Sequence, residues 1–330
     1  MLRQTGPEFE AWLIDNGSGD GSVEFTARRF PNVHVLRLPQ NLGFGKAYNQ
    51  AIAQVKAPLV ALLNNDTEVQ PGWLEGLYCD LEAHGAAAVG GKLLEMERPV
   101  VVNHAGGGIT LLGAAYDVGF GVLDGPHFSE ARPVGCATGA AMLLEREAFL
   151  DVGGFDEAYF AYFEDADLCW RLWLQGYEVR YAPRARALHA YGGSTGRSRL
   201  SAFRVENCQT NRLQNMLKNL ELGTLTWALP ASLAYDALRL TELVRAGELA
   251  AARAHAQGTR KFLRLIGHVL DERRRVQAGR VRSDAELLRM GVLTGLREGA
   301  REWWRLGKAP AASRQLATGR SSPIPRSGAE

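Results

Sequence analysis

The chain has few cysteines, and those it has are far apart. Four occur among 330 residues, at Cys79, Cys136, Cys169 and Cys208. Zinc knuckles and dithiol redox centres require closely spaced cysteines, so this spacing excludes both kinds of site. We therefore expect reduced thiols in the core of a protein from a reducing compartment.

Long apolar runs are missing as well. A transmembrane helix needs about 20 consecutive apolar residues, and the nearest candidate, Leu222–Leu240, is interrupted by Pro230 and Asp236. No secretory signal peptide precedes the first apolar segment. These absences predict a cytoplasmic protein that lies peripherally on the inner face of the cell membrane without crossing it.

Two common phosphate-binding motifs are also absent. The stretch Gly43-Phe44-Gly45 lacks the third glycine of a dinucleotide-binding fingerprint, and no Walker-type loop occurs in the chain. This argues against a dehydrogenase and against a P-loop enzyme. Because no recognised nucleic-acid-binding module appears either, we expect no nucleic-acid partner.

Charge is present but unevenly distributed. Residues 201–330 carry 22 Lys and Arg against 12 Asp and Glu, a net charge of +10. The whole chain has 38 Lys and Arg and 36 Asp and Glu. Residues 1–200 therefore carry 16 Lys and Arg against 24 Asp and Glu, a net charge of −8. The acidic part suits a cation-dependent site, and the basic part suits an anionic surface such as phospholipid head groups.

The first 200 residues alternate short apolar runs with amphipathic stretches, which is typical of α/β units around a parallel sheet. The expected strands are Ala11–Asp15, Val33–Leu38, Pro58–Leu63 and Glu178–Ala182. The expected helices are Gly45–Val55, Trp73–His84 and a helix from Glu164 to about Gln175, with strands and loops in residues 99–144. After residue 200 helical periodicity prevails, and the final residues have the composition of a disordered tail.

Polar residues end two of the expected strands. Asp15 and Asn16 end the first, and Asn64, Asn65 and Asp66 follow the third. Either cluster alone is explained by the preference of Asn and Asp for turns. Two clusters at neighbouring strand ends favour a binding site, because open α/β sheets bind ligands at the carboxyl ends of their strands.

Three carboxylates follow the aromatic run Tyr159–Phe163, at Glu164, Asp165 and Asp167. The dipole of a helix favours acidic residues in its first turn, and that alone could explain them. Apolar neighbours, however, raise the pKa of a carboxyl group towards the range of a general base. The cluster is therefore a candidate for acid–base chemistry.

His189 follows the last of the expected strands. A lone histidine is most often structural. Near a carboxylate cluster it is also a candidate ligand for a divalent metal ion.

Seven short segments occur in a characteristic order: Ile14–Ser18, Asn41–Asn49, Leu62–Thr67, Thr138–Leu143, Gly153–Glu157, Phe163–Arg171 and His189–Ser194. Together they resemble the family-2 glycosyltransferases of the GT-A fold, particularly the bacterial rhamnosyltransferase-like branch. The resemblance covers about residues 10–220 and implies an α/β, Rossmann-like fold. It divides the chain into a GT-A catalytic domain at residues 1–200, a basic helical region at 201–308 and a disordered tail at 309–330.

The resemblance implies an inverting, metal-dependent transfer of one sugar from a nucleotide-diphospho-sugar to a hydroxyl group. The acceptor would be a glycan or a lipid-linked glycan in cell-surface polysaccharide synthesis. The branch points to rhamnose as the sugar.

The same resemblance assigns roles to individual residues. Asn64-Asn65-Asp66 stands where many members have Asp-x-Asp, so binding of Mg²⁺ or Mn²⁺ would rest on Asp66 and His189. Asp165 matches the catalytic base, and the acceptor side would include Gly139, Ala140 and Glu164. Contacts with the nucleotide-sugar would come from Asp15, Asn16, Asn41, Gly43, Asn49, Asn64 and Asn65.

One piece of the family pattern is absent. Members begin with an apolar strand and a helix before the strand that ends at Asp15, whereas Met1–Gln4 resembles only the end of that helix. Loss of that strand would expose two edges of a buried sheet. We expect a start codon assigned too far downstream, the alternative being a remnant with impaired folding.

Two other functions stay open. A sugar-nucleotide pyrophosphorylase shares the nucleotide-binding architecture but needs a glycine-rich basic loop, and none is visible. An inactive, membrane-associated scaffold derived from a glycosyltransferase is the non-enzymatic alternative. The basic helical region has two interpretations of its own, as a packed cap or as a docking surface for an anionic membrane.

Overall fold

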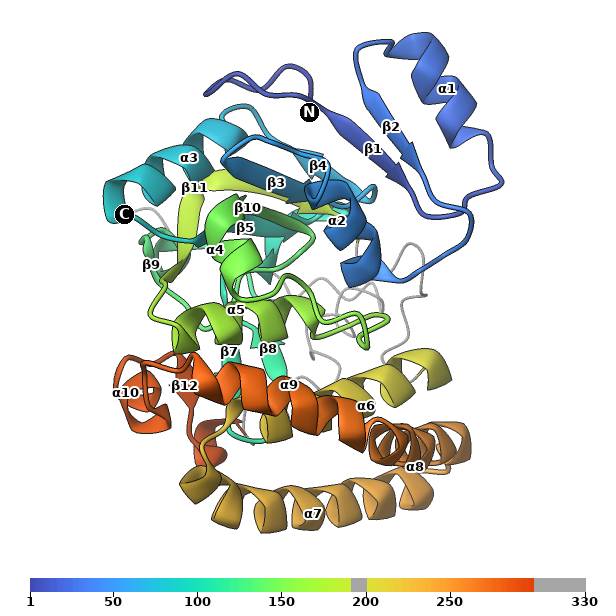
Figure 1. Cartoon of the computed structure of the whole chain (residues 1–330), viewed down its shortest axis with the longest axis vertical. Coiled ribbons are helices and arrows are strands. Elements are labelled where there is room, and N and C mark those ends of the chain that lie inside the picture. The colour runs from blue at the N-terminus through green and yellow to red at the C-terminus, as the bar shows by residue number, and fades with distance from the viewer. Residues whose placement is uncertain (191–200, 300–330) are drawn as a thin grey trace, which may run out of the picture.

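The computed structural model describes residues 1–190 and 201–299 of the chain (Figure 1). The predicted tail at 309–330 lies outside these residues. The strands are β1 (Trp12–Asp15), β2 (His34–Arg37), β3 (Leu59–Leu63), β4 (Thr67–Val69), β5 (Ala88–Glu95), β6 (Arg98–His104), β7 (Gly107–Thr110), β8 (Ala115–Asp117), β9 (Arg132–Pro133), β10 (Ala141–Glu145), β11 (Val179–His189) and β12 (Leu293–Thr294). The helices are α1 (Ser22–Arg29), α2 (Phe44–Ile52), α3 (Trp73–His84), α4 (Arg146–Asp151), α5 (Glu164–Leu174), α6 (Ala202–Asn219), α7 (Leu222–Arg245), α8 (Leu249–Arg264), α9 (Ile266–Ala278) and α10 (Asp284–Arg289).

The largest sheet is mixed and has the strand order β3-β10-β5-β11-β4. β5 and β11 are parallel, whereas β10 runs antiparallel to both β3 and β5. The prediction of a parallel sheet is therefore wrong for β10, although it holds for β5 with β11. β10 is reached through the irregular segment after β9 and not through a helical crossover, which is the connection that parallel neighbours need.

Apolar side chains hold the helices against this sheet. One buried cluster contains Trp73, Leu74, Leu77 and Leu81 from a single face of α3. Another contains most of α5, where the predicted helix begins at Glu164 as expected. In Figure 1, α3 lies above the sheet and α5 lies between the sheet and the lower helices. The 3.6-residue spacing of the apolar positions explains why α3 was predictable, whereas α5 is buried on nearly all sides.

β11 is longer than predicted. The expected strand Glu178–Ala182 continues to His189, with a register shift between Ala182 and Arg186. Pro183 falls inside this irregular stretch, and a proline is tolerated in a strand at a bulge. His189 is thus the last residue of the strand, where pairing with β4 and β5 fixes its backbone.

The cysteines are all free, as expected. Cys136 and Cys169 are buried, but Cys79 is exposed. The prediction of core thiols is wrong for Cys79 because it lies on the outward face of α3.

β1 and β2 form a separate parallel sheet of two strands. Within the described residues, β1 pairs only with β2, and β3 pairs only with β10. The edges that are left unpaired border one cavity, whose wall includes Trp12 and Ile14 of β1 and Leu59 and Ala61 of β3. An open slot thus separates the two sheets.

The chain after residue 200 is helical up to α10, and α6 is its most buried helix. The following residues return to the first part of the molecule, where β12 pairs with β7 in a sheet of order β12-β7-β8. Among residues 1–190 and 201–299, no helix combines the length and hydrophobicity needed to span a bilayer.

Candidate active site

A cavity of about 2670 Å³ runs from the slot beside β1 to the start of α5. Asp66 and Asp165 both line it, so the two carboxylates that the sequence singled out face one space. Twelve of the thirteen predicted site residues are on its wall: Asp15, Asn16, Asn41, Gly43, Asn64, Asn65, Asp66, Gly139, Ala140, Glu164, Asp165 and His189.

Asp15 ends β1 at the edge of the cavity. Its side chain is almost fully buried, and Oδ1 accepts a hydrogen bond of 2.9 Å from the backbone N–H of Ser18. Oδ2 has no hydrogen-bond partner and lies 3.5 Å from Nε of Arg37, its register partner on β2. A buried carboxylate oxygen without a donor is suited to accept one from a ligand.

Asn16 and Asn41 shape the loop that leads into α2. Oδ1 of Asn16 accepts from the backbone N–H of Leu42 at 2.8 Å, and its Nδ2 donates to the carbonyl of Gly43 at 3.1 Å. Gly43 has a φ of +84°, and a Cβ there would lie 2.6 Å from the carbonyl oxygen of Phe160. Only glycine therefore fits this close approach to the turn before α5.

Asn49 is the one predicted nucleotide-sugar contact that is not on the cavity wall. Its amide is used elsewhere. Nδ2 donates to the carbonyl of Phe155 at 2.8 Å, and Oδ1 accepts from the N–H of the same residue at 2.9 Å. Asn49 thereby fixes the Gly153–Glu157 segment to α2, which is a positioning role.

Asp66 and His189 meet at one point of the wall. Oδ1 of Asp66 lies 3.4 Å from Nε2 of His189, and the backbone N–H of Ala190 donates to the carbonyl of Asp66 at 2.9 Å. On the other side of the ring, Nδ1 lies 2.9 Å from Oδ1 of the buried Asn103 on β6. If Nδ1 donates this hydrogen bond, Nε2 keeps its lone pair towards Asp66. The segment Gly192–Ser194 lies outside the described residues.

Asp165 is held at the N-terminus of α5 by two backbone donors. The N–H of Gly139 donates to Oδ2 at 3.0 Å, and the N–H of Ala166 donates to Oδ1 at 2.8 Å. The neighbouring carbonyl of Ala140 accepts from the N–H of Asn64 at 2.9 Å. Gly139-Ala140 therefore connects the Asp165 carboxylate to the end of β3, and Asp66 follows shortly after that strand.

Desolvation sets the charge state of the adjacent carboxyl groups. Burial, reinforced by the charge of Asp165, raises the pKa of Glu164 to about 8. Burial also raises the pKa of Asp165, and the hydrogen bonds from Gly139 and Ala166 oppose this shift. Glu164 is thus largely neutral at pH 7, whereas Asp165 has backbone donors that favour its charged form.

Asp167, the third carboxylate of the cluster, is fully buried and is paired with cationic side chains. Its Oδ2 accepts from Nε of Arg171 at 2.9 Å, and Oδ1 lies 2.9 Å from Nζ of Lys218. Asn219 donates a further hydrogen bond of 3.1 Å to Oδ1. Because Asp167 is absent from the cavity wall, Asp165 is the better candidate for a base.

The turn before α5 is strained. Tyr162 and Phe163 are the non-glycine residues with positive φ in the described chain, at 69° and 67°. Such a conformation costs of order 1–3 kcal/mol and persists only when the surroundings impose it. Nδ2 of Asn211 on α6 donates to the carbonyls of Ala161 and Tyr162 at 3.0 and 2.7 Å.

Sequence reasoning missed Asn103 and Asn211. Each is an internal residue of a strand or helix and more than 45 residues from its partner, so no local pattern distinguishes it. A signal for either residue would require knowledge of the tertiary pairing.

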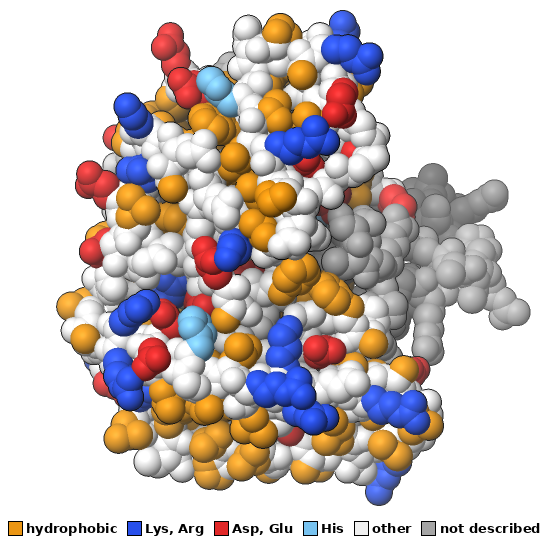
Figure 2. Space-filling model, turned by 45° about the vertical axis from the view of Figure 1, so that its right-hand side comes forward, with side chains coloured by type: hydrophobic (Ala, Val, Ile, Leu, Met, Phe, Trp, Pro, Cys, Tyr) orange, Lys and Arg blue, Asp and Glu red, His pale blue; other side chains and the backbone are white. Residues whose placement is uncertain are grey.

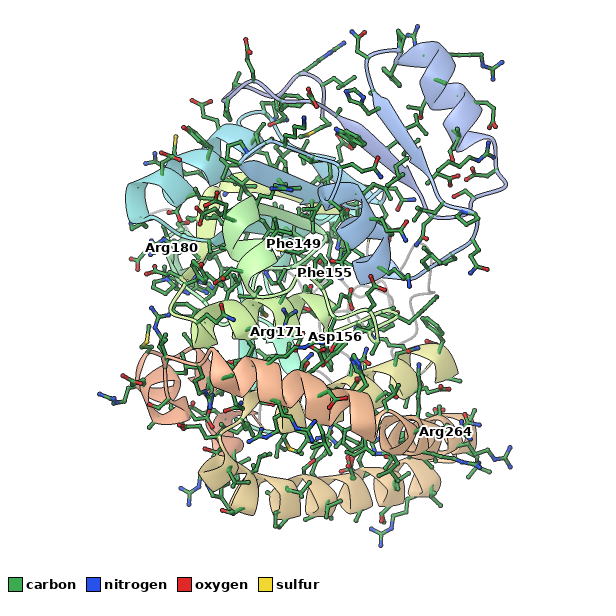
Figure 3. The ribbon with its side chains drawn as sticks, in the orientation of Figure 1. Phe149, Phe155, Asp156, Arg171, Arg180 and Arg264 are labelled. Atoms are coloured by element: carbon green, nitrogen blue, oxygen red, sulfur yellow. The ribbon has the colours of Figure 1, made fainter. Side chains whose placement is uncertain are left out.

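Asp156 joins this region to the helices below it. It lies with Arg171 where the α5 layer meets α9 (Figure 3). Its Oδ2 lies 2.6 Å from Nζ of Lys218 on α6, and Oδ1 lies 2.9 Å from Nε2 of His268 on α9. Asp156 is therefore an anchor for two helices of the basic region.

Two family models match the chain. The model of glycosyl transferase family 2 matches residues 1–150, and a model described as the N-terminal domain of galactosyltransferase matches residues 126–192. Together the matched ranges contain every predicted site residue.

Relatives are found among characterised proteins. N-acetylglucosaminyl-diphospho-decaprenol L-rhamnosyltransferase of Mycobacterium tuberculosis is 32% identical over 224 residues, which covers 60% of this chain and 72% of the relative. Rhamnosyltransferase WbbL of Escherichia coli is 47% identical over 70 residues, covering 21% of this chain and 26% of that protein.

A solved structure of GalNAc-T7 with UDP, GalNAc and Mn²⁺ is similar to this chain, with a TM-score of 0.50 and a sequence identity of 17%. The superposed part covers 64% of this chain and 43% of that chain. At this identity the likeness concerns the fold alone. The matched model and the relative from M. tuberculosis agree on the family, and the solved structure agrees on the fold. The chain therefore belongs to glycosyl transferase family 2 and is a GT-A-fold glycosyltransferase that uses a nucleotide-sugar donor.

Proposed function

We propose that this glycosyltransferase is metal-dependent and inverting, and that it transfers rhamnose to a lipid-linked glycan acceptor in cell-surface polysaccharide synthesis. The observation that carries the mechanism is the single cavity bordered by Asp66, His189 and Asp165. The names of the relatives from M. tuberculosis and E. coli support rhamnose, and the decaprenol in the first name supports a lipid-linked acceptor.

Asp66 and His189 are the residues that would hold Mg²⁺ or Mn²⁺. The described residues contain no cluster of three His, Cys, Asp or Glu side chains placed for a metal ion. A pair is sufficient for these cations, because they are commonly bound through one or two protein ligands together with substrate phosphates. When bound, the cation would neutralise the negative charge that develops on the leaving diphosphate.

Asp165 would act as the general base. It takes the proton of the acceptor hydroxyl while the acceptor oxygen bonds to the anomeric carbon and the bond from that carbon to the diphosphate oxygen breaks. The nucleoside diphosphate leaves from the opposite side of the sugar, so the anomeric configuration inverts. The hydrogen bonds from Gly139 and Ala166 keep Asp165 in place for this transfer.

The remaining wall residues divide between the two substrates. Asp15, Asn16, Asn41, Gly43, Asn64 and Asn65 would surround the nucleotide-sugar. Gly139, Ala140 and the largely neutral Glu164 would border the acceptor. A neutral carboxylic acid donates a hydrogen bond, so Glu164 can bind a sugar oxygen without competing with Asp165 for the proton.

The decisive experiment is Asp165→Asn. General-base catalysis contributes about 10²–10⁴-fold, so transfer should fall by at least about 10²-fold while the affinity for the nucleotide-sugar stays within a few fold. Asp151→Asn, a carboxylate outside the cavity, is the matched control and should retain full activity. Undiminished transfer by Asp165→Asn would exclude this residue as the base.

The same assay separates the alternatives. A transferase releases nucleoside diphosphate only when an acceptor is present, and the anomeric configuration of the product tests inversion. A sugar-nucleotide pyrophosphorylase would instead form nucleoside triphosphate from the nucleotide-sugar and pyrophosphate. An inactive scaffold would do neither. For the location of the enzyme we propose the cytoplasmic face of the membrane that holds the acceptor.

A further inference from the structure

The outward face of α7 is apolar over most of its length. Between Glu221 and Arg239 the only charged residue is Asp236, and it points inward. The large apolar side chains that are exposed on this helix are Leu222, Trp227, Leu229, Leu233, Leu238 and Val244. Leu233 and Leu238 are 59% and 67% exposed, so packing within the described chain does not explain them.

α7 differs from an ordinary surface helix because its outward face is apolar, while its inward face buries apolar side chains such as Leu225 and Leu243 together with polar ones. Its inward face holds the buried Ser232 and Asp236, which bind Arg212 of α6. A helix that covers a core normally buries its apolar side and exposes its polar side. An exposed contiguous apolar face indicates a surface that is covered in the functional state.

Positive charge surrounds this face. Residues 222–264, which contain α7 and α8, carry six Lys and Arg against three Asp and Glu. Arg245, Arg253, Arg260 and Arg264 are exposed among them, and Figure 3 labels Arg264 at α8. Figure 2 shows hydrophobic side chains along the lower edge of the molecule, where α7 lies, with Lys and Arg side chains above them.

We infer that the outward face of α7 is a docking surface that inserts into the head-group region of an anionic lipid bilayer. An apolar helix face with a basic border has the chemistry of an interfacial helix, because acyl chains accept the leucines and anionic head groups attract the arginines. This inference deepens the proposed function, since it names the surface on which a lipid-linked acceptor would be reached.

α6 connects the docking surface to the active-site cavity. Its first turns carry Phe203 and Arg204 on the cavity wall, whereas Arg212 forms hydrogen bonds of 2.7 and 2.9 Å with the carboxylate of Asp236 on α7. A helix of 18 residues is thus fixed to the site at one end and to the docking helix at its middle. Docking of α7 would hold the cavity at a set height above the lipid surface.

The test measures binding of the full chain to vesicles, without any transfer reaction. Vesicles of phosphatidylcholine with phosphatidylglycerol are compared with vesicles of phosphatidylcholine alone, at low and high salt. The double variant Leu233→Gln/Leu238→Gln removes apolar surface without altering charge, and should bind the anionic vesicles at least tenfold more weakly. Phe25→Gln is the matched control, because Phe25 is 57% exposed on α1 at the opposite end of the molecule.

Trp227 supplies an independent readout of depth. Lipids brominated on their acyl chains should quench part of the tryptophan fluorescence of the wild type, and Trp227→Phe should remove that quenched component. Binding should also weaken as salt rises, since screening reduces the attraction of the arginines for the head groups.

Three results would overturn the inference. The wild type could ignore anionic vesicles at low salt, or the double leucine variant could bind as tightly as the control. The wild type could also be a dimer that the leucine variant dissociates without any change in vesicle binding, which would make the face an interface between copies. Transfer to a water-soluble acceptor should be unchanged in the leucine variant, so failure of docking is distinguishable from failure of the proposed activity.

Discussion

At the scale of single residues, Asn103 determines how His189 is presented to the cavity. Its Oδ1 lies 2.9 Å from Nδ1 of His189, on the side of the ring away from Asp66. Groups that orient a metal-binding histidine in this way typically contribute about 10–100-fold to metal affinity. Asn103 belongs to β6, so its position follows from the pairing of β6 with β5 and not from the local sequence.

We therefore predict that Asn103→Ala weakens binding of Mn²⁺ about 10–100-fold in the presence of nucleoside diphosphate. The ring of His189 would lose the contact that orients its Nδ1. Calorimetric titration with Mn²⁺ measures the change without reference to activity. Asn207→Ala is the control, since Asn207 is an equally buried asparagine on α6 and lies off the cavity wall. Equal affinities in wild type and Asn103→Ala would contradict this role.

Glu164 makes the stability of the protein depend on pH. Its pKa is raised from 4.5 to about 8 in the folded state by burial and by the charge of Asp165. A raised pKa gives stability that is fully present below pH 4.5 and lost as the pH rises through 8. Ionising this buried carboxyl group in the folded protein should cost up to about 5 kcal/mol.

Glu164→Gln should remove this loss, because an amide does not ionise. The free energy of unfolding is measured in urea at pH 5 and at pH 9 for both proteins. Relative to the wild type, the variant should gain several kcal/mol between pH 5 and pH 9, which is about the free energy that corresponds to the raised pKa of Glu164. A difference that stays constant between these pH values would show that Glu164 ionises normally.

At the scale of elements, the sequence predicted what local periodicity encodes. The expected helix Trp73–His84 matches α3 in both bounds, and the expected strand Pro58–Leu63 differs from β3 by one residue. The order of the strands was not predictable, since it depends on pairs such as Met142 with Leu62, which lie far apart in the chain. Strand-end residues such as Asp66 were found because they lie in runs of turn-forming residues, whereas Asn103 does not lie in such a run.

The sheet of β1 and β2 should be the least protected part of the first 190 residues. Two-stranded sheets are marginal in water, and β1 has an unpaired edge along the slot. We predict that amide hydrogens of β1 and β2 exchange at least about 10²-fold faster than those of β5 and β11, because local opening requires little free energy. Hydrogen exchange followed by mass spectrometry measures this, with β10, which is paired on both edges, as the internal reference. Equal protection of both sheets would contradict the prediction.

At the scale of the whole molecule, the helical region is joined to the catalytic part by buried charge. Lys218 of α6 is 1% exposed, and its Nζ lies 2.6 Å from Asp156 and 2.9 Å from Asp167. The charge of Lys218 lowers the pKa of Asp156 well below 3.8, although burial opposes this. The sequence assigned Lys218 to a helical region that began at residue 201, and nothing local indicated that it neutralises two acids of the first part.

Lys218→Met should destabilise the protein by about 3–5 kcal/mol at pH 7, because it leaves two buried carboxylates without their shared cation. A lowered pKa gives stability that is present above pH 3.8 and lost as the pH falls towards the folded-state value. The difference between variant and wild type should therefore shrink at pH 3. Urea unfolding at both pH values measures it.

Lys46→Met is the matched control for this experiment. Lys46 lies 2.8 Å from Glu157, the neighbour of Asp156, but both side chains of that pair are at least 40% exposed. An exposed ion pair contributes about 0–1 kcal/mol, so this variant should change stability little at either pH. If Lys218→Met were no more damaging than Lys46→Met, the buried cluster would not be what holds α6 against α5, and apolar packing such as that of Leu213 and Met216 would have to account for it.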